Sequence, residues 1–333
     1  MVTMLDVAKK AGVSKATVSR VLNGKNIVRP DVVSAVFKAI QETGYRPNLL
    51  ARQLATQQTN FVGLVITNAL FNGPYFSSLV YHAATFTEQR QHQLVIADGK
   101  HSAQDERDAI NFLTDMRCKG IVVYPKYLSD EQLGEIIDKS PIPIVVVNHQ
   151  VTQHPQCTVA SDHYQSACRV MQHMVEKGHQ SIAFIAGREN SFTGTQRLKA
   201  YRDMCHQHAL DTDPRLVVQG DWTPQSGYLA AKQLIASGAE FSAILAGNDE
   251  MALGAIKALF EHGYRVPEDV SIAGFDNINL ADFVTPSLTS VSIPLEQMAQ
   301  KGVLMILGEH EQAQQLSIQG ELIERNSIFD RST

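Results

Sequence analysis

The feature that most restricts the fold of this 333-residue chain is a series of short, almost wholly apolar runs separated by stretches with helical spacing. The runs begin at positions 61, 93, 120, 142, 181, 216, 242 and 270, and the clearest intervening helices are expected at 103–116 and 249–262. Strands so rich in valine and isoleucine are buried on both faces, as in parallel sheets covered by helices on each side. Two such sets of strands predict two doubly wound α/β subdomains, with further extended segments from 289 and 317.

Size and composition exclude several other classes of protein. The chain is roughly twice the ~150 residues of a typical domain, and 44% of its residues are hydrophobic and 19% charged, as in globular proteins. No apolar run approaches the ~18 residues of a membrane helix. Asp6, Lys9 and Lys10 lie where a secretory signal has its apolar core, so we expect a cytoplasmic protein. The four separated cysteines include no C-x-x-C pair and indicate free thiols rather than a zinc site or disulfide framework.

The charges are distributed unevenly along the chain. Residues 1–58 carry nine Lys or Arg against three acidic residues, a net charge of +6, whereas the remainder carries 20 against 31, a net charge of −11. This asymmetry indicates a small module that binds a polyanion, attached to a larger body that does not. A solvated basic face is the alternative on charge alone.

The basic module has the pattern of three short helices. The first is expected from Met4 to Ala11 after a Thr3 cap, with Gly12 ending it. A second follows Ser14 and runs to about residue 23, and a third runs over 30–43 with Pro30 at its first position and a glycine after it. Two helices joined by a glycine-containing turn and supported by a third form a helix-turn-helix, whose second helix lies in the DNA major groove.

Side chains at the start of the second helix are suited to reading DNA. Lys15 and Ala16 are expected to face base edges, with Arg20 one turn later on the same side. Arginine offers a fork for guanine O6 and N7, lysine makes a looser version of this contact, and an alanine methyl can contact the methyl group of thymine. Short polar side chains nearby suit phosphates, which fix the register without reading sequence. Taken singly, each could be an ordinary solvated residue.

The run "DVAKKAGVSKATVSRVLNG" from Asp6 and the run "GYRPNLLARQLA" from Gly44 resemble the signatures of the LacI/GalR family of bacterial transcription regulators. The resemblance implies a DNA-binding domain over 1–46 and a hinge and linker over 47–59. It also implies that 48–54 forms a helix on DNA, pairs with its dimer mate in the minor groove and inserts Leu54 as an apolar wedge. One departure is "VRPDVVSAV", where Val32 and Val33 replace the usual polar residues. The residues predicted to contact DNA are Thr3, Ser14, Lys15, Ala16, Thr17, Ser19, Arg20, Asn23, Asn48, Ala51, Arg52 and Leu54.

The same resemblance implies a core similar to periplasmic sugar-binding proteins over 60–333, which binds effector and dimerises. The chain would cross between lobes near 160, 290 and 319. This divides the core into an N-subdomain of about 60–160 plus 291–318 and a C-subdomain of about 161–290 plus 319–330. The segments "DGKHSAQDERDAI" and "WTPQSG" look closest to the galactose-type and arbutin-salicin-cellobiose branch of repressors.

Ligands of open parallel sheets bind beyond the carboxyl ends of the strands, and two facing lobes make this region a cleft. Carboxylate, amide and guanidinium groups can bond adjacent hydroxyls, while aromatic rings pack on the C–H face of a sugar. Residues following the predicted strands include Thr67, Tyr124 and Asn148, and the predicted effector site comprises Asn68, Tyr75, Phe76, Asp98, Lys100, Asp162, Arg197, Trp222, Asn248 and Asp276. For Arg197, Asn248 and Asp276 the family motifs "RLKAY", "GNDEMALGA" and "GFDN" add that these positions contact effector.

Several of these residues have structural alternatives. Asn248 and Asp249 could cap the following helix, and Trp222 and Phe76 could fill core. Cationic residues near the cleft, Lys100, Arg197 and Lys126, leave a phosphorylated glycoside open, and the aromatic rings leave a purine-like corepressor open as the alternative effector. Whether the ligand induces or co-represses is also open.

Catalysis is not expected. No G-x-S-x-G, P-loop or H-E-x-x-H motif occurs, and a glycosidase pair of Asp162 and Asp276 would leave the helix-turn-helix without a use. A secreted sugar-binding protein is disfavoured by the basic module. We therefore expect a cytoplasmic repressor without a metal or cofactor, controlled by a small sugar or glycoside. A homodimer should read a pseudo-palindromic operator, and the segment after Arg325 is too short for a tetramerising leucine-heptad helix.

Overall fold

The computed structural model describes residues 2–22, 28–45, 59–67, 73–189, 191–309 and 316–332. The chain divides into two compact units, 1–59 and 60–333, which are described separately below. Within the described residues, no helix has the length and apolar character needed to cross a membrane.

The first unit is a bundle of three helices: α1 (Met4–Ala11), α2 (Lys15–Leu22) and α3 (Pro30–Thr43). Gly12 ends α1 in the left-handed conformation, with φ of 68°, which glycine adopts without a steric penalty. The core contains one fully buried valine from each helix, Val7, Val18 and Val36. Val32 and Val33, the apolar departures from the family pattern, pack against this core.

The second unit contains two six-stranded sheets, ordered β11-β5-β4-β3-β1-β2 and β12-β10-β9-β8-β6-β7. All pairings are parallel except that of β10 with β12. The strands are β1 (Phe61–Ile66), β2 (Gln93–Asp98), β3 (Ile121–Val123), β4 (Ile144–Val147), β5 (Thr158–Ser161), β6 (Ile182–Ala186), β7 (Val217–Gln219), β8 (Ala243–Ala246), β9 (Ser271–Phe275), β10 (Thr289–Ser292), β11 (Leu316–Ile318) and β12 (Glu321–Ile323). The expected class, a helix-turn-helix head with an α/β core, is confirmed.

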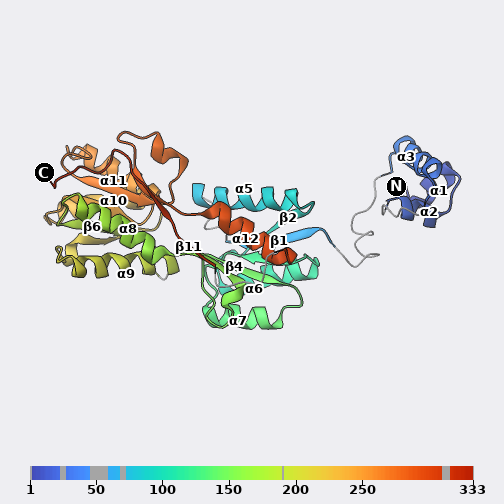
Figure 1. Ribbon diagram of the computed structural model, residues 1–333, viewed down its shortest axis with the longest axis horizontal. Helices are drawn as coiled ribbons and strands as arrows, with labels where there is room; N and C mark the ends of the chain where they lie inside the picture. Colours follow the sequence, from blue (N-terminus) through green and yellow to red (C-terminus); the bar gives the residue numbers. More distant parts are fainter. Residues whose placement is uncertain are drawn as a thin grey trace. The chain divides into compact units, whose positions relative to one another are not determined.

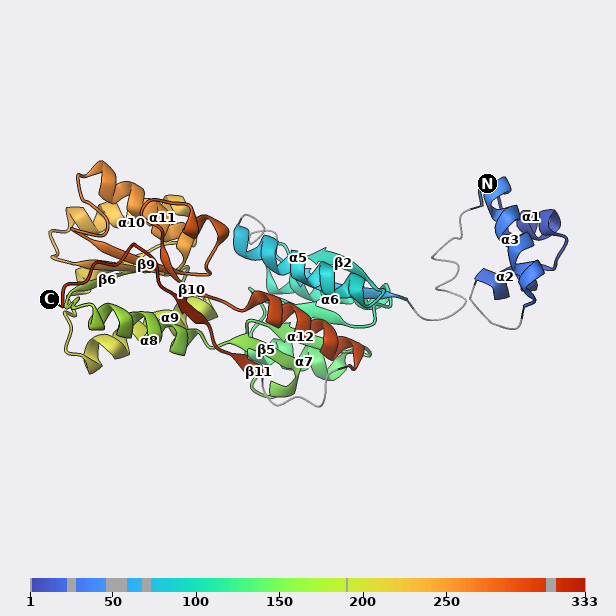
Figure 2. The same ribbon diagram turned by 45° about the horizontal axis from the view of Figure 1, so that its top comes forward.

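Helices cover both faces of each sheet, which explains the apolar character of the strands (Figure 1). Helices α5 and α12 lie side by side on one face of the first sheet, with α6 and α7 on the other; α8 and α9 cover one face of the second sheet, and α10 and α11 its other face (Figure 2). The bounds are α5 (Pro74–Gln89), α6 (Ala103–Asp115), α7 (Asp130–Lys139), α8 (His163–Glu176), α9 (Phe192–Gln207), α10 (Pro224–Ala236), α11 (Asp249–Glu261) and α12 (Leu295–Leu307), with short 3-10 turns at Pro155–Cys157, Pro214–Leu216 and Asn279–Asp282.

We call the sheet containing β1 with its helices the first lobe, and the other sheet with its helices the second lobe. The chain passes between them three times: from β5 into α8, from β10 into α12, and from β11 into β12. Residues 316–323 thus supply an edge strand to both sheets. The two lobes are interleaved in sequence, and neither is one continuous segment.

Candidate functional site

A cavity of about 730 Å³ lies between the two lobes, at the carboxyl ends of several strands. This volume is within the usual range for a pocket that binds a small molecule. The cavity brings together six of the ten predicted effector residues: Tyr75, Phe76, Arg197, Trp222, Asn248 and Asp276. It is also lined by Tyr124 and Asn148, which directly follow β3 and β4.

Three other predicted residues are not among the described residues that line this cavity. Asp98 accepts a hydrogen bond from the backbone N–H of Lys100 at 2.8 Å, so its carboxylate closes a local turn. Lys100 itself is exposed. Asp162 accepts from the N–H of Gln165 at 2.9 Å and thereby caps α8. The remaining predicted residue, Asn68, lies outside the described part of the chain.

Arg197, on α9, forms the buried electrostatic centre of the cavity. Its side chain donates from Nη1 to the carbonyl of Gly247 at 2.6 Å and from Nη2 to Oδ1 of Asp276 at 3.3 Å. The guanidinium also lies 4.1 Å from the ring centroid of Phe275. Burial raises the pKa of Asp276, and the charge of Arg197 opposes this rise. The pair presents a carboxylate and a guanidinium that can bond a polar ligand.

Asn248 and Asp249 follow β8 and have different roles. Asn248 accepts from the N–H of Met251 at 3.0 Å, which caps α11, while its amide donates to the carbonyl of Trp222 at 3.1 Å. Asp249 is fully buried and accepts from the backbone N–H of Ile278 at 3.0 Å. Burial raises its pKa well above the usual value. Asp249 therefore braces the loop after β9 rather than lining the cavity.

The backbone is strained at three positions in the cavity wall. Asn148, Trp222 and Asp276 have φ values of 61°, 77° and 97°, in the region that residues other than glycine seldom adopt. Each such residue costs of order 1–3 kcal/mol, and such positions concentrate at functional sites. The Trp222 ring lies so close to Gly187 that a Cβ atom there would overlap it. Neighbouring structure thus fixes both the backbone and the ring of Trp222.

Aromatic rings form the first-lobe wall of the cavity. The ring of Phe76 lies 5.2 Å from that of Tyr75 and 5.1 Å from that of Tyr124, in edge-to-face geometry. Burial raises the pKa of Tyr124 to about 12, so its hydroxyl remains protonated. The Tyr75 hydroxyl is buried and has no hydrogen-bond partner among the described residues. This wall offers apolar ring faces and hydroxyl donors together.

A buried polar network connects the lobes beside the cavity, and sequence reasoning had singled out only its Asn148 and Tyr124. Asn148, in the first lobe, donates to Thr193 Oγ1 of α9 at 3.1 Å and to the Tyr124 hydroxyl at 2.6 Å. Its Oδ1 lies 2.7 Å from Nε2 of His163, on α8 in the second lobe. Burial, together with the charge of Arg197, lowers the pKa of His163 well below its usual value. The ring is therefore neutral, and Nε2–H donates to Asn148.

The predicted DNA-reading residues of α2 lie on its accessible side. Lys15, Ala16 and Arg20 are exposed, whereas Val18 is buried in the bundle. Ser14 accepts from the backbone N–H of Thr17 at 3.1 Å, which caps the helix, and Ser19 is partly buried. Thr3 donates to Asp6 from its backbone and its hydroxyl, at the start of α1. The predicted contacts Asn23, Asn48, Ala51, Arg52 and Leu54 lie outside the described residues.

Comparisons with known proteins identify this combination of head and core. Residues 3–48 match the model of the bacterial regulatory proteins of the lacI family, and residues 171–328 match the periplasmic binding protein-like domain. The chain is 45% identical over 332 residues to the HTH-type transcriptional regulator AscG of Escherichia coli, with 99% of both chains covered. The chain belongs to the lacI family. It is accordingly a DNA-binding transcription regulator.

Solved lacI-family structures have the same architecture. The crystal structure of the E. coli repressor ascG is 40% identical, with a TM-score of 0.76 over 81% of this chain and 100% of that one. A CelR–cellobiose complex is 31% identical, with a TM-score of 0.72 over 98% and 100% of the two chains. A lac repressor dimer bound to operator and the anti-inducer ONPF is 26% identical, with a TM-score of 0.88 over 98% and 99%.

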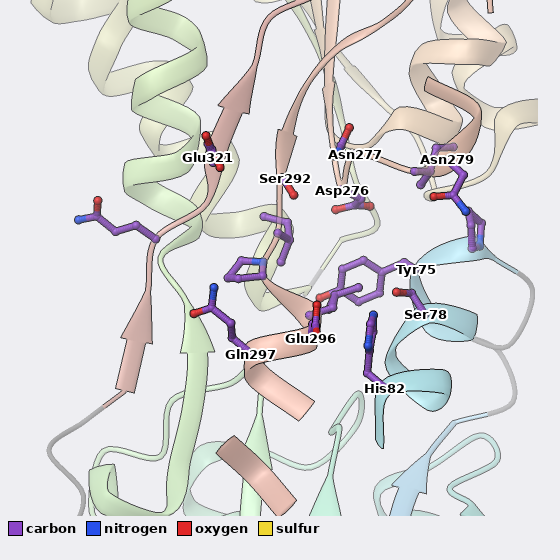
Figure 3. Close-up of a pocket in the computed structure, with 16 residues that line it drawn as sticks. Tyr75, Ser78, His82, Asp276, Asn277, Asn279, Ser292, Glu296, Gln297 and Glu321 are labelled. Carbon is purple, nitrogen blue, oxygen red and sulfur yellow. The ribbon is translucent and has the colours of Figure 1, made fainter. Parts of the chain in front are cut away.

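The lacI-family core of this chain contains a second, smaller cavity of about 410 Å³ at the junction of the lobes. Figure 3 shows Tyr75, Ser78 and His82 extending from α5 toward this space, with Glu296 at the start of α12. Tyr75 and Asp276 line both cavities. These two residues therefore lie where the two cavities adjoin. Among the described residues, no group of His, Cys, Asp and Glu is arranged to hold a metal ion.

Proposed function

We propose that this lacI-family regulator is a homodimeric repressor of carbohydrate-utilisation genes, and that a small sugar or glycoside in the larger cavity controls its operator affinity. The observation that carries the proposal is the composition of the cavity wall. The Arg197–Asp276 pair and the Asn248 amide can bond adjacent hydroxyls, and Trp222 and Phe76 offer ring faces to the C–H groups of a sugar. The cellobiose bound to CelR supports this ligand class.

The operator contacts are assigned to the head. We propose that α2 reads the major groove through Lys15, Ala16 and Arg20, while Thr17, Ser19 and Asn23 contact phosphates. Thr3 and Ser14 are further proposed contacts of the head with DNA. For residues 48–54, which lie outside the described part of the chain, we propose the role of paired hinge helices in the minor groove. A single head reads one half-site, so a dimer on a pseudo-palindromic operator follows, as in the operator-bound dimer of the lac repressor. A cytoplasmic location follows from the DNA target, and transcription control rather than catalysis is the assigned activity.

The proposed switch is a change in how the two lobes, and hence the two subunits, are oriented. Ligand contacts both lobes, because the cavity wall includes Tyr75 and Phe76 from the first and Arg197 and Asp276 from the second. A ligand shifts such an equilibrium only by its different affinities for the two arrangements, and couplings of about 1–3 kcal/mol are usual. Reorienting the first lobes would separate the hinge helices and weaken operator binding.

A calorimetric screen tests the ligand class. Galactose, salicin, cellobiose, their 6-phosphates and the purines hypoxanthine and guanine are titrated into the protein, and operator affinity is then measured with and without each binder. We expect a sugar to bind and to change operator affinity about 5- to 150-fold. Binding of a purine alone would favour the alternative effector, and a sugar that leaves operator affinity unchanged would contradict the proposed switch.

A further inference from the structure

Glu250, the second residue of α11, lines the larger cavity, and its carboxylate lies near Gly73 of the first lobe. A Cβ atom on Gly73 would lie 2.8 Å from Glu250 Oε2 and 3.7 Å from its Cδ. Gly73 has an extended backbone with φ of −155°, which any residue can adopt. The carboxylate of Glu250 therefore lies close to the backbone of Gly73, and a side chain at this position would require the end of Glu250 to move.

The contact places an acidic group at the start of a helix in the opposite lobe. Gly73 is the N-cap of α5 and has no side chain to accept from the first backbone N–H groups, and Pro74 at the next position has no N–H. The amino end of a helix carries a partial positive charge that favours a carboxylate nearby. Glu250 supplies this carboxylate from the second lobe, so the contact depends on how the lobes are oriented.

The charges around Glu250 disfavour a second anion. Burial raises the pKa of Glu250, and the neighbouring charge of Asp276 adds to this rise and brings it to about 7. The guanidinium of Arg197 is already bonded to Asp276 and to the Gly247 carbonyl. The other cationic side chains of the cavity wall, Lys126 and Arg188, belong to the loops after β3 and β6. A phosphate beside Glu250 would add negative charge to two carboxylates, whereas a hydroxyl can donate to either of them.

We propose that Glu250 determines effector specificity: its carboxylate accepts a hydrogen bond from a hydroxyl of an uncharged sugar and excludes a phosphorylated one. This inference rests on the proposed sugar-binding function and narrows it to unphosphorylated glycosides. Glu250 also links the bound ring to the start of α5, because the same carboxylate contacts Gly73. Glu250 thus takes part both in recognising the ligand and in setting the orientation of the lobes.

The test compares cellobiose and salicin with their 6-phosphates by calorimetry on the full-length wild-type protein, Glu250→Gln and Glu250→Asp. The wild type should bind the neutral sugars at least about tenfold tighter than the phosphates. Glu250→Gln removes the charge but keeps the shape, and it should weaken neutral-sugar binding about 10- to 100-fold, the value of a hydrogen bond to a charged group. The same change should reduce the ratio of the affinity for the neutral sugar to the affinity for its 6-phosphate. Glu250→Asp keeps the charge but has a shorter side chain. It should therefore bind neutral sugars more weakly than the wild type does, and still prefer them to their 6-phosphates.

Glu240→Gln is the matched control, because Glu240 is an exposed residue of the same lobe that does not line the cavity. It should behave as the wild type does. Equal or tighter wild-type binding of a 6-phosphate, with its phosphate directed to Lys126 and Arg188, would overturn the inference while leaving a sugar-controlled repressor in place. The inference would also be overturned if Glu250→Gln had the same ratio of neutral-sugar to 6-phosphate affinity as the wild type. If purines bind and none of the sugars does, both the inference and the sugar function fail together.

Discussion

Arg197 and Asp276 form an ion pair in which the two side chains are only 2% and 9% exposed, and it contains one hydrogen bond of 3.3 Å. The pair is incompletely bonded, since Arg197 Nε is buried without a partner among the described residues. A buried ion pair compensates for its lost hydration only when its remaining hydrogen-bonding groups are satisfied. A polyhydroxy ligand that supplies hydrogen-bond partners to these groups should therefore gain much of its binding free energy at this ion pair.

Replacing Arg197 by Ala should separate DNA binding from ligand response. The change leaves Asp276 as an unpaired buried carboxylate and should lower the free energy of unfolding by about 3–5 kcal/mol, measured by urea denaturation. Operator binding should persist at temperatures where the protein is folded, but ligand should no longer alter it. Arg202→Ala, on the exposed side of the same helix, is the control. A normal ligand response in Arg197→Ala would remove Arg197 from the site.

Replacing Gly187 by Ala should displace the ring of Trp222. The new Cβ atom would overlap the indole, which is the only tryptophan of the chain, so its fluorescence reports the change directly. We expect a shifted emission maximum and weaker binding of the effector. In the control Gly302→Ala the nearest atom to the new Cβ is 3.7 Å away, at Val122, and the emission should not change. Wild-type fluorescence and affinity in Gly187→Ala would show that the ring position does not matter for binding.

The neutral state of His163 should make stability depend on pH. Burial depresses its folded-state pKa below the ordinary 6.5, so the unfolded chain binds a proton that the folded protein does not. Stability from this group is complete above about pH 6.5 and is lost as the pH falls below it. In His163→Gln, which retains a donor toward Asn148, unfolding free energies at pH 7.5 and 5.5 should differ less than in the wild type. The exposed control His206→Gln should show the same change in unfolding free energy between the two pH values as the wild type. If His163→Gln also shows that change, the assignment is contradicted.

Leu54 should act as a wedge in operator DNA. Leu54→Ala should weaken operator binding and reduce the DNA bend, measured by energy transfer between dyes at the operator ends, because alanine is too small to unstack a base step. The effector affinity of the isolated protein should not change. Equal affinity and equal bending would exclude the wedge. In both proteins the operator affinity should fall steeply with salt, since phosphate contacts dominate such binding.

The fold could be predicted from the sequence because local signals and burial agree along most of the chain. Gly12 and Pro30 mark helix ends in the head, and the uninterrupted apolar runs are strands of two predominantly parallel sheets. Cavity residues such as Asp276 and Tyr124 could be found by taking the positions that directly follow strands. The strained backbones of Asn148 and Trp222 have no sequence signal, because neither is a glycine.

The same rule selected Asp98 and Asp162, which the structure places outside the cavity wall. Their carboxylates are used by nearby backbone N–H groups, and short polar side chains after a strand often take such local bonds. Sequence reasoning also missed Glu250 and His163, whose importance arises from contact with the opposite lobe. Distances between lobes depend on how three connections are packed together, and this information is not carried by any one segment of sequence.

The sharing of residues 316–323 between both sheets has a consequence for how the protein is made. During synthesis the three helices of the head can fold as soon as they are released, because all their contacts are local. Neither lobe can complete its sheet until its last edge strand has left the ribosome. Until then, β5 and β10 remain without their outer partners, and unpaired strand edges invite association with other chains. A nascent regulator can therefore have a folded DNA-binding head before it has a finished site for the ligand that controls it.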